Sequence, residues 1–530
     1  MASTSFHPHD YPILLTVFCY ALACAVIMFT DKYALPARER RRYRSRKRPV
    51  VDRLARLPVI ALVFAGFFAI SWRPLYAGAG AMSFFVIFTA ISRAKYKFIR
   101  EPLVFSDIAL VADVFKYKSI FYANSLNIVF WIVAFLYVFG VSGLYMYFEP
   151  SLLPDENALF WIVVMVLVAD LPWLSLFYGP VNKPTADLVH RLVGKPNVKV
   201  STVRFGTFVS VIFHFIIWLG VRREKIVADL SERFFAAVQD LIGHDADNKA
   251  PLVIVWQSES FLDMRHQGVP GLELPTIDRL QGLAVQWGRL ATVFEGGYTL
   301  RTEFAVLSGL VPDDIHIDAS YPYLRASHYS DIVWPTKLKK AGWNTHFIHP
   351  YDRTFFLRHK AMPQLGFEAM TMLDSFDHDP LRDGTYVSDA TLTAKVIAAA
   401  EAQTDATGSF IFVASMANHG PWEPGRCGAL ADPVEIYLDI LKQSDQALGQ
   451  LVDHLNELDR PVWLVFYGDH APLLKSFADP FPDPRTDYFI VPLAAARTPQ
   501  HAPVPPRDEE PWNLLEAMLK HAKLQKDALR

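Results

Sequence analysis

The segment Glu295-Gly-Gly-Tyr-Thr-Leu-Arg-Thr-Glu-Phe-Ala-Val-Leu-Ser-Gly-Leu310 organises the second half of this chain. Its paired glycines allow a sharp turn that leaves room for a bulky anion. Thr299 follows at the predicted start of a helix, in which Leu300, Phe304 and Leu307 have helical spacing. The unpaired N–H groups and positive dipole end of a helix start favour a phosphate or sulfate. Thr299 is therefore either an ordinary helix cap or a nucleophile that attacks such a group.

Around this segment, short apolar runs alternate with helical patterns. The strand candidates are Leu252–Trp256, His346–His349, Phe410–Ser415, Trp463–Tyr467 and Tyr488–Val491. The helix candidates are Thr276–Trp287, Ser388–Ala402 and Val434–Leu458. Fully apolar strands separated by long helices are typical of a sheet that is covered on both faces. We therefore predict an α/β domain with a largely parallel central sheet.

Charged or imidazole side chains follow most of these strands. They are Glu259, then His349 with Arg358, then His419, and finally Asp469 with His470. In parallel sheets the carboxyl ends of the strands meet at one edge, where ligands bind. Mainly oxygen donors with one imidazole nitrogen suit a hard or borderline divalent ion such as Mn²⁺, Mg²⁺ or Zn²⁺. The sequence therefore predicts one ion held by Glu259, Thr299, Asp469 and His470.

The same residues suggest phosphoryl transfer. A Thr299 hydroxyl bound to a metal ion would have a lowered pKa and could act as a nucleophile. His419 is a candidate to bind the phosphate or to protonate the leaving oxygen. Arg358 and Arg301 are candidates for bidentate contacts with phosphoryl oxygens. His349 is a weaker candidate for the same site.

The N-terminal half has the composition of a membrane domain. Its apolar segments are Tyr11–Thr30, Leu57–Ser71, Tyr76–Ser92, Ile128–Phe148, Leu159–Tyr178 and Phe205–Val221. The basic run Arg38–Arg48 and two further basic loops, Arg93–Asn127 and Gly179–Arg204, favour a cytoplasmic side by the positive-inside rule. About six spans would then place the N-terminus and everything after Val221 outside. Arg222 and Arg223 are at odds with this topology.

The chain is predicted to have four parts. These are a transmembrane domain (residues 1–225), a juxtamembrane helix and linker (226–250), a catalytic domain (251–495) and a C-terminal tail and helix (496–530). The 530 residues carry a net charge of −2, which gives no indication of a nucleic-acid partner. With Cys427 alone in the second half, neither a disulfide framework nor a cysteine-based zinc site can form there.

Taken together, the motifs resemble those of a known family. They are Gln257-Ser-Glu-Ser-Phe261, the Thr299 segment, Asn418-His-Gly-Pro421 and Phe466-Tyr-Gly-Asp-His470. In this order they are similar to the lipoteichoic acid synthase family, membrane phosphoglycerol transferases of the alkaline phosphatase/sulfatase superfamily. The resemblance covers Leu252–Val491, and a multi-span anchor also fits. It implies a sulfatase-like fold and one Mn²⁺-type ion on Glu259, Thr299, Asp469 and His470.

The resemblance also assigns roles and shows departures. It implies that Thr299 carries a covalent glycerophosphate and that His419 and Arg358 contact the substrate. At the head-group site, Phe356 stands where the family has Trp, and the family's Asp is displaced by one residue, to Asp352. These departures leave the transferred head group open. Sulfatases of the superfamily carry Cys or Ser in a Cys-x-Pro-x-Arg-like motif, whereas this chain has Thr-Leu-Arg-Thr.

The leading hypothesis is a metal-dependent enzyme that moves phosphoglycerol from phosphatidylglycerol to an envelope glycan or glycolipid. Phosphoethanolamine transfer and phosphodiester hydrolysis are alternatives, and so is a catalytically silent membrane protein that binds glycans. We expect a multi-pass protein of the cytoplasmic (inner) membrane, in contact with membrane lipids. Its catalytic domain would lie on the periplasmic or extracellular side.

Overall fold

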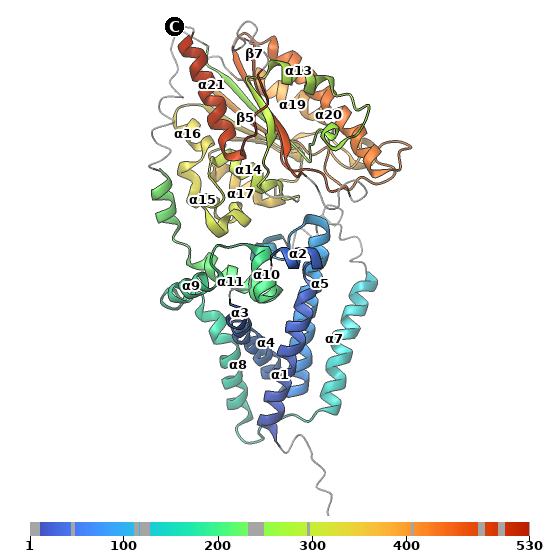
Figure 1. Cartoon of the computed structure of the whole chain (residues 1–530), viewed down its shortest axis with the longest axis vertical. Coiled ribbons are helices and arrows are strands. Elements are labelled where there is room, and N and C mark those ends of the chain that lie inside the picture. Colours follow the sequence, from blue (N-terminus) through green and yellow to red (C-terminus); the bar gives the residue numbers. More distant parts are fainter. Residues whose placement is uncertain are drawn as a thin grey trace, which may run out of the picture. The chain divides into compact units, whose positions relative to one another are not determined.

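A seven-stranded sheet, ordered β2-β7-β6-β1-β5-β3-β4, forms the centre of the C-terminal half (Figure 1). Its strands are β1 (Leu252–Ser258), β2 (Gln286–Leu290), β3 (Asn344–Ile348), β4 (Ala369–Thr371), β5 (Ser409–Ala414), β6 (Pro461–Gly468) and β7 (Thr486–Ala494). β1 pairs in parallel with β5 and β6, and β3 pairs in parallel with β4 and β5. Only β7 runs antiparallel to its neighbours, β2 and β6. The predicted α/β class with a largely parallel sheet is confirmed.

The computed structural model describes residues 11–43, 48–110, 116, 128–231, 249–293, 297–403, 407–474, 483–494, 496 and 504–528. Several predicted features lie partly outside these ranges. They are the basic run Arg38–Arg48, the loop Arg93–Asn127, the juxtamembrane helix after residue 231, the following linker, the C-terminal tail, and the pair Glu295-Gly296.

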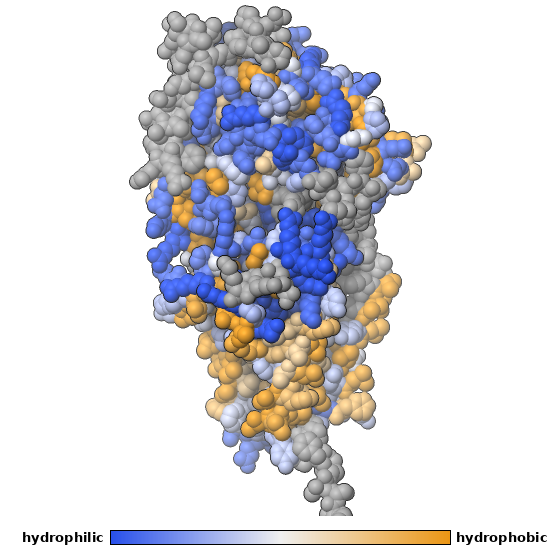
Figure 2. All heavy atoms as spheres, in the orientation of Figure 1, coloured by the Kyte–Doolittle hydropathy of each residue, from blue (hydrophilic) through white to orange (hydrophobic). Residues whose placement is uncertain are grey.

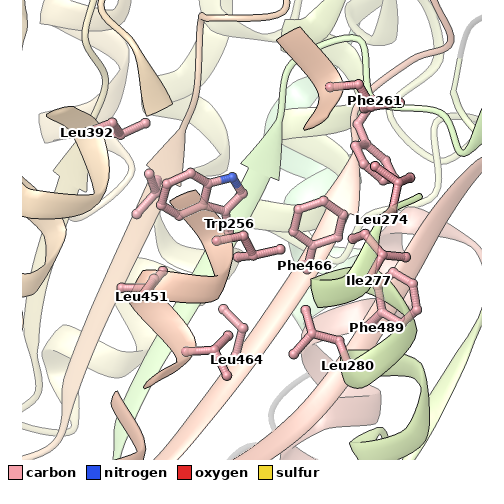
Figure 3. Packing of buried hydrophobic residues seen from close by; sticks show 14 of the residues in the cluster. Trp256, Phe261, Leu274, Ile277, Leu280, Leu392, Leu451, Leu464, Phe466 and Phe489 are labelled. Carbon is pink, nitrogen blue, oxygen red and sulfur yellow. The ribbon is translucent and has the colours of Figure 1, made fainter. Parts of the chain in front are cut away.

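The central strands β1, β5, β6 and β7 are almost entirely buried. The helices of this half are α13 (Pro275–Leu283), α14 (Thr299–Ser308), α15 (Ala326–Tyr329), α16 (Trp334–Lys340), α17 (Arg358–Gln364), α18 (Pro380–Asp383), α19 (Asp389–Glu401), α20 (Pro433–Asn456) and α21 (Leu514–Ala528). Figure 3 shows the core on one face, where Trp256 and Phe466 of the sheet lie near Ile277 of α13 and Leu451 of α20. β1 is buried along its whole length, and its first five residues, Leu252–Trp256, are apolar without alternation.

Two details of the predicted order are wrong. The helix predicted over Thr276–Trp287 ends at Leu283, and β2 begins at Gln286. Trp287 lies four residues after Leu283 and so continued the apolar helical spacing, although it belongs to the strand. The edge strand β4 was not predicted, because its three residues carry no pattern of their own.

The chain divides into two compact units, Met1–Val221 (unit 1) and Arg222–Arg530 (unit 2). Arg223 belongs to unit 2, where its Nε and Nη2 each donate to Asp318 at 2.8 Å. The Tyr329 hydroxyl donates to the same carboxylate at 2.7 Å. Both charged groups of this pair are buried. Arg223 is therefore a structural residue of unit 2. Its charge is not evidence for the side of the membrane on which this segment lies.

Unit 1 is a helical bundle with a largely apolar surface (Figure 2). Its helices are α1 (Pro12–Thr30), α2 (Ala37–Arg42), α3 (Pro49–Leu54), α4 (Leu57–Ser71), α5 (Pro74–Ile99), α7 (Ile128–Phe148), α8 (Ala158–Ser175), α9 (Gly179–Val193), α10 (Val198–Phe205) and α11 (Thr207–Gly220). Within the described ranges, four stretches are long and apolar enough to cross a membrane: Pro12–Tyr33, Pro49–Ser71, Pro74–Lys97 and Ala158–Ser175. α7 has 21 residues, a length of about 31 Å, which also matches the hydrocarbon core.

Polar contacts mark the two ends of this bundle. At one end, Glu149 accepts hydrogen bonds from the backbone N–H of Leu75 and Tyr76 at 2.7 and 2.9 Å. At the other end, which we call the basic end, Asp31 pairs with Arg56 at 3.3 Å. The short helix α2 follows Asp31 closely and adds Arg38, Arg40, Arg41 and Arg42 to the basic end. α4 starts directly after Arg56 and finishes near the Glu149 end, so it connects the two ends.

α11 begins and ends at the basic end. Its first residue, Thr207, donates its backbone N–H to Asp31 at 3.3 Å. Its last residue, Gly220, lies against Ala186 of α9, and any side chain at Gly220 would collide with Ala186. α9 follows α8, which packs along α4, and ends at Val193, whose carbonyl oxygen accepts from Arg204 at 2.8 Å. Figure 1 shows α9, α10 and α11 grouped at the same end of unit 1 as α2.

The predicted sixth span is therefore wrong. α11 has 14 residues, a length of about 21 Å, whereas the hydrocarbon core is about 30 Å thick. Half of its residues are buried against the rest of unit 1. Its apolar sequence reflects burial within protein rather than exposure to lipid. The chain consequently leaves unit 1 at the basic end.

Candidate active site

The pairing of β1 with β6 brings two carboxylates together. Ser258 and Gly468 are partners at the ends of these strands, so Glu259 and Asp469 are the next residues on neighbouring strands. The backbone N–H of Glu259 also donates to the Ser415 hydroxyl at 2.9 Å, which ties it to the end of β5. The strand ends thus meet at one edge of the sheet, as the parallel arrangement requires.

Glu259, Asp469 and His470 form a buried cluster whose potential ligand atoms all lie within 4.8 Å of one another. Oδ1 of Asp469 accepts from the backbone N–H of Ser260 and of His470, each at 2.8 Å. In the described part of the chain, its Oδ2 has no hydrogen-bond partner. His470 Nδ1 lies 3.1 Å from the carbonyl oxygen of Ala471, so it donates there and leaves Nε2 directed at the carboxylates.

The cluster shifts the pKa of each of its members. Burial raises the pKa of Asp469 to about 7, and the Glu259 charge acts in the same direction. Burial would also raise the pKa of Glu259, but His419 and His470 together hold it at about 2. Burial would lower the pKa of His470, but the two carboxylates raise it to about 9. Two buried carboxylates side by side are stabilised by a cation between them, a role that a protonated His470 or a metal ion can fill.

These residues fit a divalent metal ion. Asp469 Oδ2, a Glu259 oxygen and His470 Nε2 could supply two oxygen ligands and one nitrogen ligand. The hydrogen bond at His470 Nδ1 is the second contact that orients a histidine ligand and fixes its tautomer. Such a donor set suits Mn²⁺, Mg²⁺ or Zn²⁺.

Thr299 is the first residue of α14, and the preceding Tyr298 occupies the cap position. No side chain caps this helix start. Instead, the Thr299 hydroxyl donates to Glu259 Oε2 at 3.3 Å, which places its oxygen beside the carboxylate cluster. The structure thus separates Thr299 from the role of an ordinary helix cap.

Glu303, which the sequence interpretation missed, lies one turn after Thr299 on α14. Its carboxylate accepts from Gln257 Nε2 at 3.0 Å, from Arg358 Nε and Nη2 at 3.1 and 2.8 Å, and from the Tyr323 hydroxyl. Glu303 and Arg358 are 0% and 1% exposed, so their ion pair is fully desolvated. Burial alone would raise the pKa of Glu303, but the Arg358 charge lowers it below its usual value.

This hydrogen-bond network includes residues that precede Glu259 and Asp469 on their strands. Gln257 precedes Glu259 by two residues on β1, and Tyr467 precedes Asp469 by two residues on β6. The Tyr467 hydroxyl donates to Gln257 Oε1, and Gln257 in turn donates to Glu303. The spacing of four residues between Thr299 and Glu303 was the available sequence signal, since it places both side chains on one face of a helix.

His349 and Arg358 form hydrogen bonds with other residues of the protein. His349 Nδ1 lies 2.9 Å from the Ala414 carbonyl oxygen and donates to it, and its Nε2 accepts from Arg358 Nη1 at 3.1 Å. Burial lowers the pKa of His349 to about 3, and the Arg358 charge acts in the same direction, so the imidazole is neutral. Both ring nitrogens, and every nitrogen position of Arg358, have protein partners. These two predicted substrate contacts therefore face the network rather than an open site.

Phe356 and Asp352 lie in the loop between β3 and α17. Phe356 and Leu357 have φ values of 55° and 60°, a left-handed conformation that costs bulky residues about 1–3 kcal/mol each. The Phe356 ring lies 5.3 Å from the guanidinium carbon of Arg358. Asp352 Oδ1 accepts from the backbone N–H and the hydroxyl of Thr354, each at 2.7 Å, and so stabilises the turn.

Arg301 contacts residues beside Thr299, and His419 is within electrostatic reach of the cluster. Arg301 stacks on the Tyr298 ring at 4.4 Å, and its Nε donates to the Ser320 carbonyl oxygen at 3.0 Å. His419 follows β5, and the charge of the Glu259 carboxylate acts on its imidazole. Burial lowers the pKa of His419 below its usual value, despite this carboxylate.

Comparison with known proteins places the chain in a family. A family model described as "Sulfatase" matches residues 251–516. The chain is 74% identical over 533 aligned residues to the capsular polysaccharide biosynthesis protein RkpI of Rhizobium meliloti, covering 100% of this chain and 98% of that protein.

Comparison with solved structures found similar chains at low sequence identity. The membrane protein lipooligosaccharide phosphoethanolamine transferase A of Neisseria meningitidis matches 89% of each chain, with a TM-score of 0.47 and 14% identity. The lipoteichoic acid synthase LtaP of Listeria monocytogenes matches 54% of this chain and 77% of that chain, with a TM-score of 0.41 and 19% identity. On the extent of the family match and of the full-length relative, this chain belongs to the sulfatase family, as a member with a helical membrane unit.

Proposed function

We propose that this protein transfers a phosphoglycerol group from a phosphatidylglycerol-type lipid to an envelope glycan or glycolipid, through a covalent intermediate on Thr299. The observation that carries this proposal is the position of Thr299. Its hydroxyl starts α14, does not cap the helix, and lies 3.3 Å from a carboxylate of a buried three-residue cluster that fits a metal ion.

The chemistry has two displacement steps. The Thr299 hydroxyl gives its proton to water and its oxygen attacks the phosphorus. The bond to the diacylglycerol oxygen breaks, and that oxygen takes up a proton, for which His419 is the proposed donor. An acceptor hydroxyl then attacks the phosphorus and its proton passes to His419, while the bond to the Thr299 oxygen breaks and that oxygen takes up a proton from water. A divalent ion at the cluster, for which we propose Mn²⁺, would lower the pKa of the Thr299 hydroxyl and neutralise phosphoryl charge. The N–H groups at the start of α14 would stabilise the same charge.

Two further observations support the choice of substrates. A lipid donor suits a chain in which a membrane unit and the candidate active site are covalently joined. A glycan acceptor suits the relative that is 74% identical, which is named for capsular polysaccharide biosynthesis. Both substrates agree with a protein of the cytoplasmic (inner) membrane whose unit 2 is exported.

The test uses the full chain with labelled phosphatidylglycerol and, in parallel, labelled phosphatidylethanolamine. We expect release of diacylglycerol from phosphatidylglycerol and a glycerophosphate adduct on Thr299, detected by mass spectrometry. Thr299→Ala should form no adduct and lose activity by at least about 10³-fold, whereas Thr299→Ser, which keeps the hydroxyl, should retain part of it. Turnover of phosphatidylethanolamine alone would refute the proposed head group, and full activity of Thr299→Ala would refute the nucleophile.

A further inference from the structure

The positive charge at the basic end of unit 1 is not explained by the positive-inside rule if unit 2 is exported. Since the chain leaves unit 1 at this end, export of unit 2 puts the basic end on the exported side as well. Basic loops normally stay cytoplasmic, so this arrangement opposes the positive-inside rule. Figure 2 shows hydrophilic side chains gathered over α2, in agreement with its run of arginines.

A cavity of about 50 Å³ lies at this end. Its lining consists of Met28, Asp31, Lys32, Ala34, Leu35, Arg40, Arg56, Thr202 and Val203. Arg56 is already engaged, because it pairs with Asp31 and donates to the carbonyl oxygen of Arg204 at 2.8 Å. Lys32 and Arg40 therefore give the cavity its excess positive charge. Arg40 Nη1 also donates to the Lys32 carbonyl oxygen at 2.6 Å, which holds α2 against the cavity.

One polar atom in the lining has no partner. Thr202 is 2% exposed, and no atom of the described chain makes a hydrogen bond with its Oγ1. A buried hydroxyl without a partner costs free energy, and a rotation of the Thr202 side chain that turned Oγ1 to the cavity would let a ligand oxygen satisfy it. Two cations with a free hydroxyl form a set that suits a phosphate group.

We propose that this cavity binds the phosphate of an anionic phospholipid headgroup. The inference rests on the proposed function only for the exported side. A lipid suits the cavity better than free phosphate does, because Met28, Leu35 and Val203 form an apolar wall beside the cations. The exposed ring of Phe29 also lies 4.2 Å from the Lys32 ammonium, which places an apolar surface group beside one of the two cations.

Native mass spectrometry of the full chain in detergent tests this site. Phosphatidylglycerol, phosphatidylethanolamine and inorganic phosphate serve as separate probes. We expect retention of phosphatidylglycerol, weakened about fivefold by Lys32→Ala and by Arg40→Ala, since one basic residue near a lipid surface contributes roughly this much. Thr202→Val, which keeps the shape of the side chain, should also weaken retention. Arg41→Ala is the matched control, because Arg41 lies on the same helix, is exposed and does not line the cavity.

Each other outcome would overturn the proposal. An equal effect of Arg41→Ala would indicate diffuse attraction to charge, and equal retention of phosphatidylethanolamine would exclude an anionic headgroup. Displacement of the lipid by inorganic phosphate at similar concentration would indicate a site for the free ion. The measurement does not depend on catalysis: if Thr299→Ala stays fully active but the cavity variants still lose lipid, the proposed function fails and this site stands.

Discussion

The Arg358–Glu303 pair determines what Arg358 can do. Removing two charges from water costs several kcal/mol each, and their attraction offsets this only if both partners are present and hydrogen-bonded. Glu303 meets these conditions, since it also accepts from Gln257 and Tyr323. We therefore interpret Arg358 as a positioning residue that holds α14, and with it Thr299, against β1.

We predict that the buried Arg358 guanidinium stabilises unit 2 only when Glu303 provides its negative charge. Glu303→Gln should destabilise unit 2 by about 3–5 kcal/mol, because it leaves the buried guanidinium without its counter-charge. The double variant Glu303→Gln/Arg358→Gln removes both charges and should recover part of this loss. Thermal unfolding in detergent of the parent, the single variants Glu303→Gln and Arg358→Gln, and the double variant gives the coupling energy. Additive effects of the two substitutions would show that the pair is not coupled. They would favour the earlier prediction that Arg358 contacts the substrate directly.

Metal binding should depend strongly on pH. In the metal-free protein at pH 7, His470 holds a proton, since its pKa is raised to about 9, and Asp469 is partly protonated, with a pKa of about 7. A metal ion must displace these protons, so affinity falls as pH decreases. We expect the Kd for Mn²⁺ to rise about tenfold per pH unit from pH 8 to 7 and more steeply below pH 7. Calorimetric titration checks this, and a Kd that is constant between pH 6 and 8 would contradict the proposed ligands.

At the scale of elements, continuous apolar runs made β1, β5 and β6 predictable, and the parallel rule then predicted that Glu259 and Asp469 meet. The surroundings of helix α14 were harder to predict. Leu300, Phe304 and Leu307 defined one apolar face, which left Glu303 as an apparent solvent-facing residue, yet all ten residues of α14 are buried. A sequence pattern cannot show that the polar side of a helix faces buried partners such as Gln257, which are distant along the chain.

The helix α19 offers a test of how the free energy of unfolding depends on pH. Its first residue, Asp389, is 4% exposed, and burial raises its pKa from 3.8 to about 6. The folded state therefore binds this proton more tightly than the unfolded state does, and stability falls as pH rises from about 4 to 6, by roughly 3 kcal/mol in total. Asp389→Asn should lack this contribution. The free energy of unfolding of both proteins is measured at pH 4, 6 and 8. That of the variant should increase relative to that of the parent as pH rises, and a constant difference would contradict the raised pKa of Asp389.

At the scale of the whole molecule, the number of crossings decides the topology. Composition alone gave six apolar segments, because a helix buried within protein and a helix exposed to lipid are equally apolar. The contacts of Thr207 and Gly220 separate the two cases, since they hold both ends of α11 at the basic end. We propose that α7 crosses the membrane together with the four candidate spans in α1, α3–α4, α5 and α8, so that the chain would enter and leave unit 1 on opposite sides.

This topology predicts opposite results for reporters at the two ends of the chain. A reporter active only after export should be active after α21 and inactive before α1, and a reporter active only in the cytoplasm should show the reverse. The complete chain is required, because a fusion directly after Arg223 would separate this residue from Asp318. A reporter inserted between residues 152 and 157, after the Glu149 end, is the internal control and should match the one before α1. If both chain ends reported the exported side, α11 would have to cross the membrane, and the basic end would return to the cytoplasm, where its charges follow the positive-inside rule.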